Sequence, residues 1–309
     1  MASFSLLRTG AQHDIAAGDY RATVTELGAG LRSLRYRDRA VIAEYDADEL
    51  PPAGSGQLLA PWPNRVDHGR YSFGGASYQL DLSEPAHSNA IHGLTRWASW
   101  QLVEIGDDNV ELGVRLLGRP GYPFCLELRA RYRLSAGGGL EVTVTAHNGG
   151  QWPAPYGTGS HPYLRTGAGL VDACVLELPA AQWLPADERG IPAGSPRDVT
   201  GGDYDFRGGR QLGAIALDHA FTGLTKDDSG RAWARLSGEG STVALWAGPG
   251  YHWLQAFTGD PLGPERRRRA VAIEPMTCPP NAFATGTDLL TIAPGDSVTH
   301  QWGLQAAQD

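Results

Sequence analysis

The feature that most limits how this chain can fold is a two-residue alternation of apolar and charged side chains across residues 126–147. Leu, Ala and Tyr alternate with Glu and Arg in residues 126–134, and Leu, Val and Ala alternate with Glu, Thr and His in residues 140–147. A short Ser-Ala-Gly-Gly-Gly segment at 135–139 separates the two runs. Because successive side chains of a β-strand point to opposite faces, the pattern predicts a hairpin with one buried and one solvated face.

Shorter runs of the same kind recur along the chain, at residues 20–26, 110–116, 241–247, 253–257 and 270–274. No segment carries an apolar repeat of about 3.6 residues long enough for a core helix. The 41 glycines and 21 prolines also disfavour long helices. The sequence therefore predicts an all-β protein built as an antiparallel β-sandwich. The Gly/Pro-rich residues 186–209 are interpreted as a long loop, so residues 1–309 are expected to form a single domain.

Composition excludes several classes of function. The formal net charge of -8 and the scattered arginines argue against nucleic-acid binding, and the run 266–269 is interpreted as an exposed loop tip or a strand entry. No run approaches about 18 apolar residues and no export signal is evident, so we expect no membrane partner and a cytoplasmic protein. No P-loop, GxGxxG, HExxH, HxH or CxxC pattern occurs, so neither a cofactor nor a metal is expected.

Three dense clusters of polar and aromatic residues stand out, at residues 60–66 with 89–94, at 156–164 and at 273–283. Glu274 shares a strand face with the small residues Ala270 and Ala272, which leaves room for a ligand beside its carboxylate. His161 and Glu274 each precede a proline, which favours stiff, extended backbone at both positions. The alternatives are an exposed edge glutamate and a structural histidine.

Together these clusters resemble the aldose 1-epimerase (galactose mutarotase) family. The resemblance rests on Pro63-Asn64-Arg65, Asn89…Ile91-His92-Gly93, Ser160-His161-Pro162-Tyr163, Leu217-Asp218-His219-Ala220-Phe221 and Ile273-Glu274-Pro275…Pro280-Asn281-Ala282-Phe283. The motifs occur in the family's order, with similar separations, over residues 58–283. The resemblance implies a large single-domain antiparallel β-sandwich, the galactose mutarotase-like supersandwich, which agrees with the strand pattern.

The resemblance also implies an activity: interconversion of the α and β anomers of free aldohexoses such as glucose or galactose. Ring opening needs a base for the anomeric hydroxyl proton and an acid for the ring oxygen, and Glu274 matches the family's base and His161 its acid. A nearby carboxylate is expected to keep His161 protonated. The implied sugar-binding residues are Arg65, His92, Asp218, Asn64 and Gln255. The implied partner is a small aldose, and the protein is expected to be a monomer or homodimer.

One departure leaves the sugar open. Gly93-Leu94-Thr95-Arg96-Trp97 stands where the family often has Gly-Gly. A hexose-6-phosphate 1-epimerase would want an extra arginine near the pocket, and Arg96 is a candidate, whereas Pro63-Asn64-Arg65 favours free sugars. A non-catalytic carbohydrate-binding β-sandwich would not need two proton carriers. A glycoside hydrolase would normally use two carboxylates, with Asp218 as the second.

Overall fold

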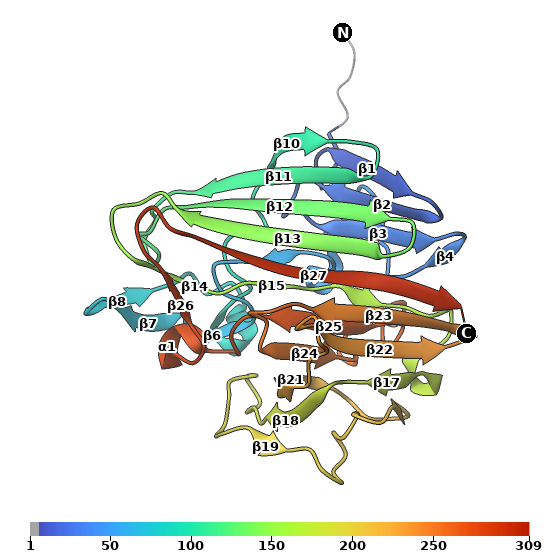
Figure 1. Cartoon of the computed structure of the whole chain (residues 1–309). Coiled ribbons are helices and arrows are strands. Elements are labelled where there is room, and N and C mark those ends of the chain that lie inside the picture. Colours follow the sequence, from blue (N-terminus) through green and yellow to red (C-terminus); the bar gives the residue numbers. More distant parts are fainter. Residues whose placement is uncertain (1–5, 309) are drawn as a thin grey trace.

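The largest sheet of the protein contains the hairpin that the alternation predicts (Figure 1). This computed structural model describes residues 6–308. Strands β12 (Leu126–Ser135) and β13 (Gly139–Asn148) pair antiparallel, with Leu126 opposite Asn148 at one end and Ser135 opposite Gly139 at the other. Side chains along β12 alternate strictly between buried and exposed. The predicted hairpin is therefore confirmed.

Nine strands make up this largest sheet. Their order is β10 (Gln101–Ile105), β11 (Asn109–Leu116), β12, β13, β27 (Ser297–Gln308), β23 (Ser241–Ala247), β22 (Ala232–Gly238), β17 (Val175–Glu177) and β20 (Arg210–Gln211). The last long strand of the chain, β27, lies between β13 and β23, so it joins the middle of the sequence to its C-terminal third.

An eight-stranded sheet lies beside it, below β27 in Figure 1. Its order is β19 (Arg197–Asp198), β18 (Ala180–Leu184), β21 (Asp218–Leu224), β24 (Trp253–Phe257), β25 (Val271–Met276), β15 (Gly159–Ser160) and β5 (Leu58–Leu59), and β16 (Tyr163–Leu164) also pairs with β25. A four-stranded sheet contains β1 (Gln12–Ala17), β2 (Tyr20–Thr25), β3 (Leu31–Tyr36) and β4 (Arg39–Ala40). All pairs between the named strands of residues 6–308 are antiparallel, as predicted, and one isolated bridge, between Ala60 and Gly93, is parallel.

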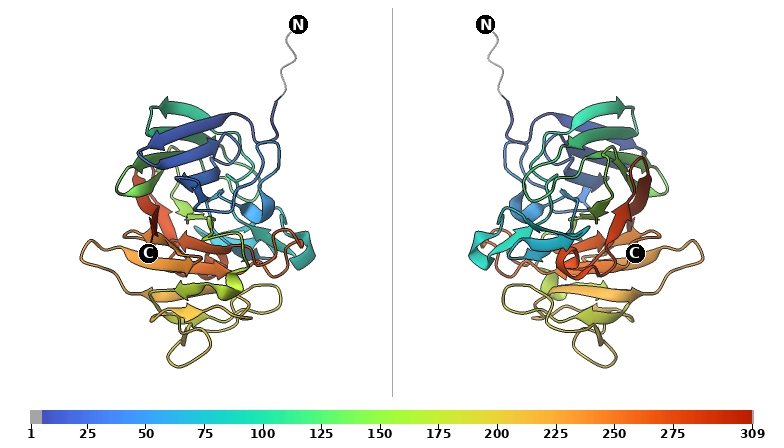
Figure 2. Two further views of the ribbon diagram at one scale, coloured as in Figure 1. Left: turned by 90° about the vertical axis from the view of Figure 1, so that its right-hand side faces the viewer. Right: turned by 90° about the vertical axis from the view of Figure 1, so that its left-hand side faces the viewer.

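Three small two-stranded sheets and a few short helices complete the structure (Figure 2). The pairs are β6 (Arg65–Asp67) with β9 (Asn89–Ile91), β7 (Arg70–Phe73) with β8 (Ala76–Gln79), and β14 (Ala154–Tyr156) with β26 (Leu290–Ile292). The helices are α1 (Ala282–Thr285) and the 3-10 turns Pro52–Gly54, Pro85–His87 and Val171–Ala173. Among the described residues, no helix has both the length and the apolar character needed to span a membrane.

The three large sheets contribute to one cluster of buried apolar side chains. Its bulky members include Trp100, Tyr132 and Trp302, each almost fully buried. The Tyr132 hydroxyl donates a hydrogen bond to the backbone oxygen of Ala29 at 2.6 Å, which ties β12 to the turn before β3. A buried phenol needs such a partner, because an unpaired polar group in the core is costly.

Most of the predicted strands occur where the sequence places them. Residues 241–247 and 253–257 coincide with β23 and β24, and residues 186–209 contain only the short strand β19. The interpretation of residues 266–269 as exposed is wrong for Arg268. This side chain is buried and forms ion pairs with Asp172 at 2.7 Å and Asp260 at 2.9 Å. Two carboxylates compensate the desolvation of its charge, a pairing that the local sequence does not reveal.

The alternation along β12 predicts unequal costs for neighbouring substitutions. Leu128→Ala removes a buried side chain and is expected to lower the free energy of unfolding by about 2–5 kcal/mol. Arg129→Ala removes only a surface ion pair with Glu111, worth about 0–1 kcal/mol. Urea denaturation of both variants measures the difference, and equal losses would contradict the burial pattern.

Candidate active site

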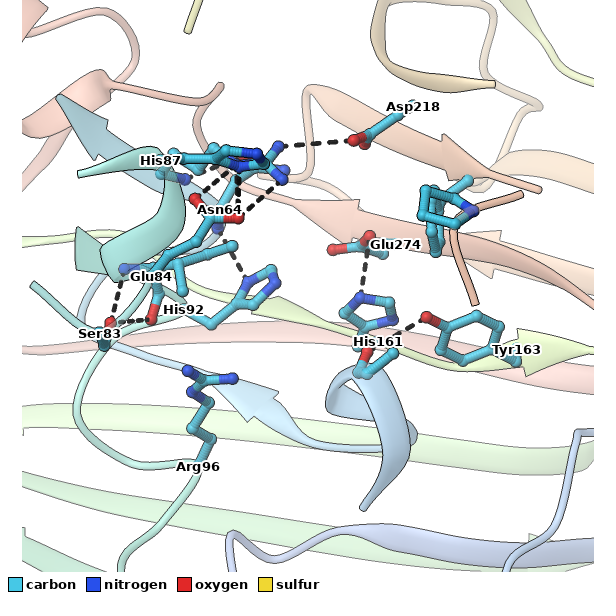
Figure 3. Close-up of a pocket in the computed structure, with 15 residues that line it drawn as sticks. Asn64, Ser83, Glu84, His87, His92, Arg96, His161, Tyr163, Asp218 and Glu274 are labelled. Atoms are coloured by element: carbon cyan, nitrogen blue, oxygen red, sulfur yellow. Dashed lines mark hydrogen bonds and ion pairs between the residues drawn. The ribbon is translucent and has the colours of Figure 1, made fainter. Parts of the chain in front are cut away.

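A cavity of about 410 Å³ brings together six of the seven site residues predicted from the sequence (Figure 3). Those that line it are Asn64, Arg65, His92, His161, Asp218 and Glu274. Gln255 does not line it. Gln255 is buried behind Asp218, and its side-chain amide donates a 2.6 Å hydrogen bond to Asp218 Oδ1. Of the two aromatic residues that share its strand face, Phe257 reaches the cavity and Trp253 does not.

The register of the eight-stranded sheet sets His161 opposite Glu274. Gly159 in β15 pairs with Met276 of β25, and Tyr163 in β16 pairs with Ala272 of the same strand. Midway between these two pairs lies His161 on the side of β15 and β16, and Glu274 on β25. Cross-strand neighbours in an antiparallel sheet project to the same face, so the two side chains meet. This register is the structural origin of the pair.

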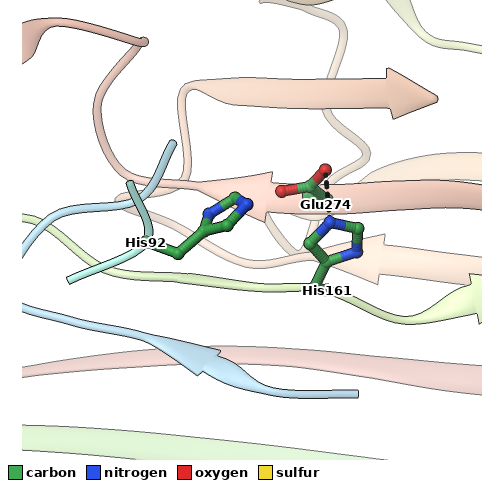
Figure 4. Close-up of side chains that lie close together, drawn as sticks. All are labelled: His92, His161 and Glu274. Carbon is green, nitrogen blue, oxygen red and sulfur yellow. Dashed lines mark ion pairs between the residues drawn. The ribbon is translucent and has the colours of Figure 1, made fainter. Parts of the chain in front are cut away.

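The His161 imidazole and the Glu274 carboxylate point toward each other (Figure 4), and both lie almost completely out of contact with solvent. His161 Nε2 is 3.3 Å from Glu274 Oε1, and the side chains are only 5% and 3% exposed. Tyr163 stacks on the imidazole with ring centroids 4.9 Å apart, and the Tyr163 hydroxyl donates to Ala53. Gly54, in the left-handed region, also lies against the ring, where a Cβ would be 3.1 Å from His161 Cδ2. Contacts with Tyr163 and Gly54 therefore both limit the movement of the ring.

Burial controls the protonation of this pair. Loss of solvation raises the pKa of Glu274 well above its usual range, and the charge of Asp218 adds to the effect while Arg65 opposes it. Loss of solvation also lowers the pKa of His161 to about 3. The expectation that a neighbouring carboxylate keeps His161 protonated is therefore wrong. Desolvation outweighs the attraction between the charges and favours a neutral imidazole beside a protonated carboxyl group.

His92 closes the side of the cavity next to His161. Their ring centroids are 5.3 Å apart in an edge-on arrangement. The backbone N–H of Asn64 donates to His92 Nδ1 at 3.2 Å, and the N–H of His92 donates back to the Asn64 oxygen at 2.9 Å. Because Nδ1 accepts a hydrogen bond, the ring proton lies on Nε2, which is free to donate to a ligand. Burial keeps the pKa of His92 well below its usual value, so the ring is neutral.

Arg65 is held by carboxylates on two sides. Glu84 accepts hydrogen bonds from Nε and Nη2 at 3.0 Å each, and Asp218 Oδ2 lies 3.6 Å from Nη1. Burial disfavours both charges, but the hydrogen bonds from Arg65 outweigh it and lower the pKa of Glu84. The result is a rigid guanidinium whose charge is already balanced.

Glu84 is a site residue that the sequence reasoning missed. It lines the cavity and fixes Arg65, and it precedes Pro85 just as His161 and Glu274 precede prolines. That shared X-Pro context is the signal that could have found it. Tyr163 was also missed as a functional residue, although it belongs to the motif that contains His161.

The long loop after β18 also supports the site. Arg189 donates hydrogen bonds to the oxygen of His87 at 2.9 Å and to Asn89 Oδ1 at 3.0 Å, and it pairs with Asp67 at 2.8 Å. The next residue, Gly190, has a φ of +73° and lies against the Arg65 guanidinium, where a Cβ would overlap it. The loop is thereby fastened over Arg65 and limits its movement.

Among the described residues, His92, His161 and Glu274 are the group that could hold a metal ion. Their potential ligand atoms all lie within 4.8 Å of one another. Two imidazoles and a carboxylate suit a divalent transition metal. An ion would compete for the same nitrogen and oxygen atoms that otherwise exchange a proton, so the two uses exclude each other.

Comparison with known proteins gives a consistent result. A family model described as aldose 1-epimerase matches residues 12–305. YihR of Escherichia coli, described as uncharacterized, is 37% identical over 281 residues, which are 91% of this chain and 88% of YihR. The aldose 1-epimerase of E. coli is 26% identical over 225 residues, which are 67% of this chain and 64% of that protein.

Solved structures show the same fold. A putative aldose 1-epimerase from E. coli has a TM-score of 0.84 at 22% identity and covers 97% of this chain and 99% of its own. The GalM/aldose epimerase homologue from C. elegans has a TM-score of 0.85 at 20% identity, with 96% and 99% covered. The predicted galactose mutarotase-like β-sandwich is therefore confirmed.

Because burial raises the pKa of Glu274, the carboxylate form destabilises the folded state. That cost is absent at low pH and grows as the pH rises through the raised pKa. Glu274→Gln cannot ionise, so its stability relative to wild type is expected to increase from pH 5 to pH 9, by about 0.5–2 kcal/mol. Chemical denaturation at several pH values measures this trend.

Glu141→Gln, at a partly exposed position of β13, serves as the matched control and is expected to stay within about 0.5 kcal/mol of wild type at each pH. A stability gain for Glu274→Gln that shrinks with rising pH would mean that the folded protein favours the carboxylate.

Proposed function

Because the chain belongs to the aldose 1-epimerase family, we propose that it interconverts the α and β anomers of an aldohexose. The observation that carries the proposal is the buried His161–Glu274 pair, 3.3 Å apart, at the wall of a cavity of about 410 Å³. A cavity of this size falls within the usual range of about 300–1,000 Å³ for small-molecule sites. Glucose and galactose are the first sugars to test.

In this proposal the His161–Glu274 pair carries a single proton, which takes part in both ring opening and ring closure. Moving that proton from Glu274 to His161 creates a carboxylate base and an imidazolium acid together. Glu274 then takes the proton of the anomeric hydroxyl while His161 protonates the ring oxygen, and the C1–O5 bond breaks to give the open aldehyde. The pair is now neutral, which is the form that burial favours. Desolvation thus helps the opening step.

Reclosure reverses both transfers. After rotation about C1–C2, His161 accepts the proton of the O5 hydroxyl and Glu274 returns a proton to the carbonyl oxygen as the ring forms. The other anomer results, and the pair regains its ionic form without any cofactor. Each positioned proton transfer contributes about 10²–10⁴-fold to the rate.

The other cavity residues suit recognition of sugar hydroxyls. Asp218 and Arg65 offer an acceptor and a donor fixed by each other, and His92 offers the Nε2 donor. Asn64 lines the same wall. Gln255 orients Asp218 from behind through the 2.6 Å hydrogen bond. We propose that the first four contact the sugar and that Gln255 acts through Asp218.

The rival functions fit the geometry less well. A carbohydrate-binding protein has no use for a buried imidazole and carboxyl group held face to face at a cost in stability. A glycoside hydrolase needs a second carboxylate free to act as acid or nucleophile. Asp218 is engaged by both Arg65 and Gln255, and the group next to Glu274 is an imidazole.

Polarimetry on freshly dissolved α-D-glucose and α-D-galactose tests the proposal. The protein is expected to speed the approach to an unchanged final rotation. Glu274→Gln and His161→Asn are each expected to reduce kcat by about 10²–10⁴-fold, because each removes one proton carrier. His147→Gln, on the polar face of β13, is the matched control and is expected to act like wild type. Full activity in either site variant, with an unchanged circular dichroism spectrum, would refute these roles.

The pH profile gives a second test. Activity requires one proton on the pair, so kcat/KM is expected to show no break near pH 6.5, the usual value for histidine. On the acid side, activity is expected to fall toward pH 3, where protonation of His161 gives the pair a second proton. The alkaline limb lies above the usual range of a glutamate, where Glu274 loses the proton. An acid limb centred near pH 6.5 would show that His161 titrates as an ordinary histidine.

A further inference from the structure

Asn89 is a buried amide that the proposed mechanism does not use, although it belongs to the motif that contains His92. It lies in β9, does not line the cavity and is fully buried. Its Nδ2 donates hydrogen bonds to Glu84 Oε2 at 3.0 Å and to the backbone oxygen of Arg189 at 2.9 Å. Its Oδ1 accepts one from Arg189 Nη2 at 3.0 Å. Both amide hydrogens and the amide oxygen are thus engaged, so Asn89 joins Glu84 to Arg189 in one fixed orientation.

Glu84 is held in the orientation that binds Arg65. The backbone N–H groups of Glu84 and Asn89 each donate to the other residue's oxygen, at 2.9 and 3.2 Å, which places the two side chains next to each other. Besides accepting from Asn89, the carboxylate directs both oxygens at Arg65, where Oε2 accepts from Nε and Oε1 from Nη2 at 3.0 Å each. Such a two-point contact fixes the plane of a guanidinium as well as its position. Asn89 therefore acts on Arg65 through Glu84.

Arg189 attaches a compact turn to the same region. Asp187 Oδ1 accepts hydrogen bonds from two N–H groups of the turn at 2.9 Å each, and backbone hydrogen bonds close the turn over residues 185–193. The Arg189 guanidinium then donates to the backbone oxygen of His87 at 2.9 Å and pairs with Asp67 at 2.8 Å. Arg189 is therefore the residue that fastens this turn to β6 and to the segment before β9.

The turn also touches Arg65 directly. Gly190 has a φ of +73° and lies so close that a Cβ would be 2.3 Å from Arg65 Nη1. Glu84 binds the Nε and Nη2 edge of the same guanidinium, so Arg65 is restrained on two edges. Both restraints meet at Asn89, which bonds to Glu84 and to the residue before Gly190. Loss of either contact of Asn89 would give Arg65 more freedom.

We propose that Asn89 and Arg189 are positioning residues that raise the affinity of the cavity for its sugar by holding Arg65 in place. This role rests on the proposed function, in which Arg65 contacts sugar hydroxyls, and deepens it by naming the residues that set the strength of that contact. An arginine that is ordered before the sugar arrives loses less side-chain entropy on binding. Within residues 6–308 neither side chain has a hydrogen bond or ion pair with His161 or Glu274, so the effect falls on binding and leaves proton transfer intact.

Two substitutions test the role by separating KM from kcat. Anomer exchange is followed by polarimetry over a range of sugar concentrations, with whichever of glucose and galactose the wild type exchanges faster. Arg189→Gln removes the guanidinium that fastens the turn and is expected to raise KM by about 3–10-fold, while kcat stays within about twofold. Asn89→Asp keeps the size of the side chain but replaces its donors with a second carboxylate beside Glu84, so an equal or larger rise is expected.

Matched variants distinguish positioning from a general loss of stability. Arg207→Gln removes a similar ion pair, with Asp205 at 2.8 Å, between β19 and β20, and is expected to leave KM unchanged. Arg189→Lys keeps the charge opposite Asp67 without the planar guanidinium, so its KM is expected between those of wild type and Arg189→Gln. Thermal unfolding of each variant is measured in parallel, because a merely structural role would lower the Tm without changing KM.

A double-mutant cycle tests whether the effect passes through Arg65. Arg65→Gln removes the group that is positioned, so adding Arg189→Gln to it is expected to change kcat/KM by less than about twofold. An equal loss of kcat/KM with and without Arg65 would show that Arg189 acts independently of Arg65 and would overturn its positioning role.

The outcomes also separate these roles from the proposed function. Exchange by wild type with an unchanged KM in Arg189→Gln, or a loss confined to kcat, would overturn the roles of Asn89 and Arg189 and leave the epimerase proposal in place. No acceleration of either sugar by wild type would contradict both. The Arg189 side chain is partly exposed, so Arg189→Gln decides the question even if the buried substitution Asn89→Asp prevents folding.

Discussion

The site depends on a carboxyl group and an imidazole that are held 3.3 Å apart and almost fully removed from water. In water each would titrate at its ordinary pKa, about 4.3 for glutamate and about 6.5 for histidine, so a single proton on the pair would sit on the imidazole. Desolvation reverses this preference by penalising both charges, which favours the form with the proton on Glu274. The two forms of the pair differ by one proton transfer, which is the change that ring opening and closure require.

The fold produces this arrangement through the pairing register of its antiparallel sheet. β15 and β16 pair with β25 on either side of His161, so the register sets His161 opposite Glu274. β24 pairs with the other edge of β25 and places Gln255 in the same row. The short strand β6 then supplies Arg65, and loops supply Glu84 beside it and Arg96 on another side of the cavity. A rigid sheet holds the reacting pair while less regular segments surround the ligand.

The sequence predicts the parts of this structure that local periodicity controls. Alternation along residues 126–147 indicates the hairpin, and small residues beside Glu274 indicate an open space at its carboxylate. Contacts between segments far apart in the sequence have no such signal, so the ion pair of Arg65 with Glu84, the burial of Arg268 and the position of Gln255 behind Asp218 could not be predicted. The protonation of His161 was predicted in the wrong direction, because the extent of its burial depends on contacts with Gly54 and Tyr163 that only the fold creates.

The central claim is that this pair moves protons between oxygen atoms and breaks no bond between carbon and hydrogen. NMR of the protein with an aldohexose in D₂O tests it directly. The account predicts accelerated exchange between the α and β anomeric signals, with the H1 and H2 intensities unchanged over many turnovers. Loss of the H2 signal to deuterium would show proton abstraction from carbon, and the absence of accelerated exchange would show no ring opening. Either result would contradict the account.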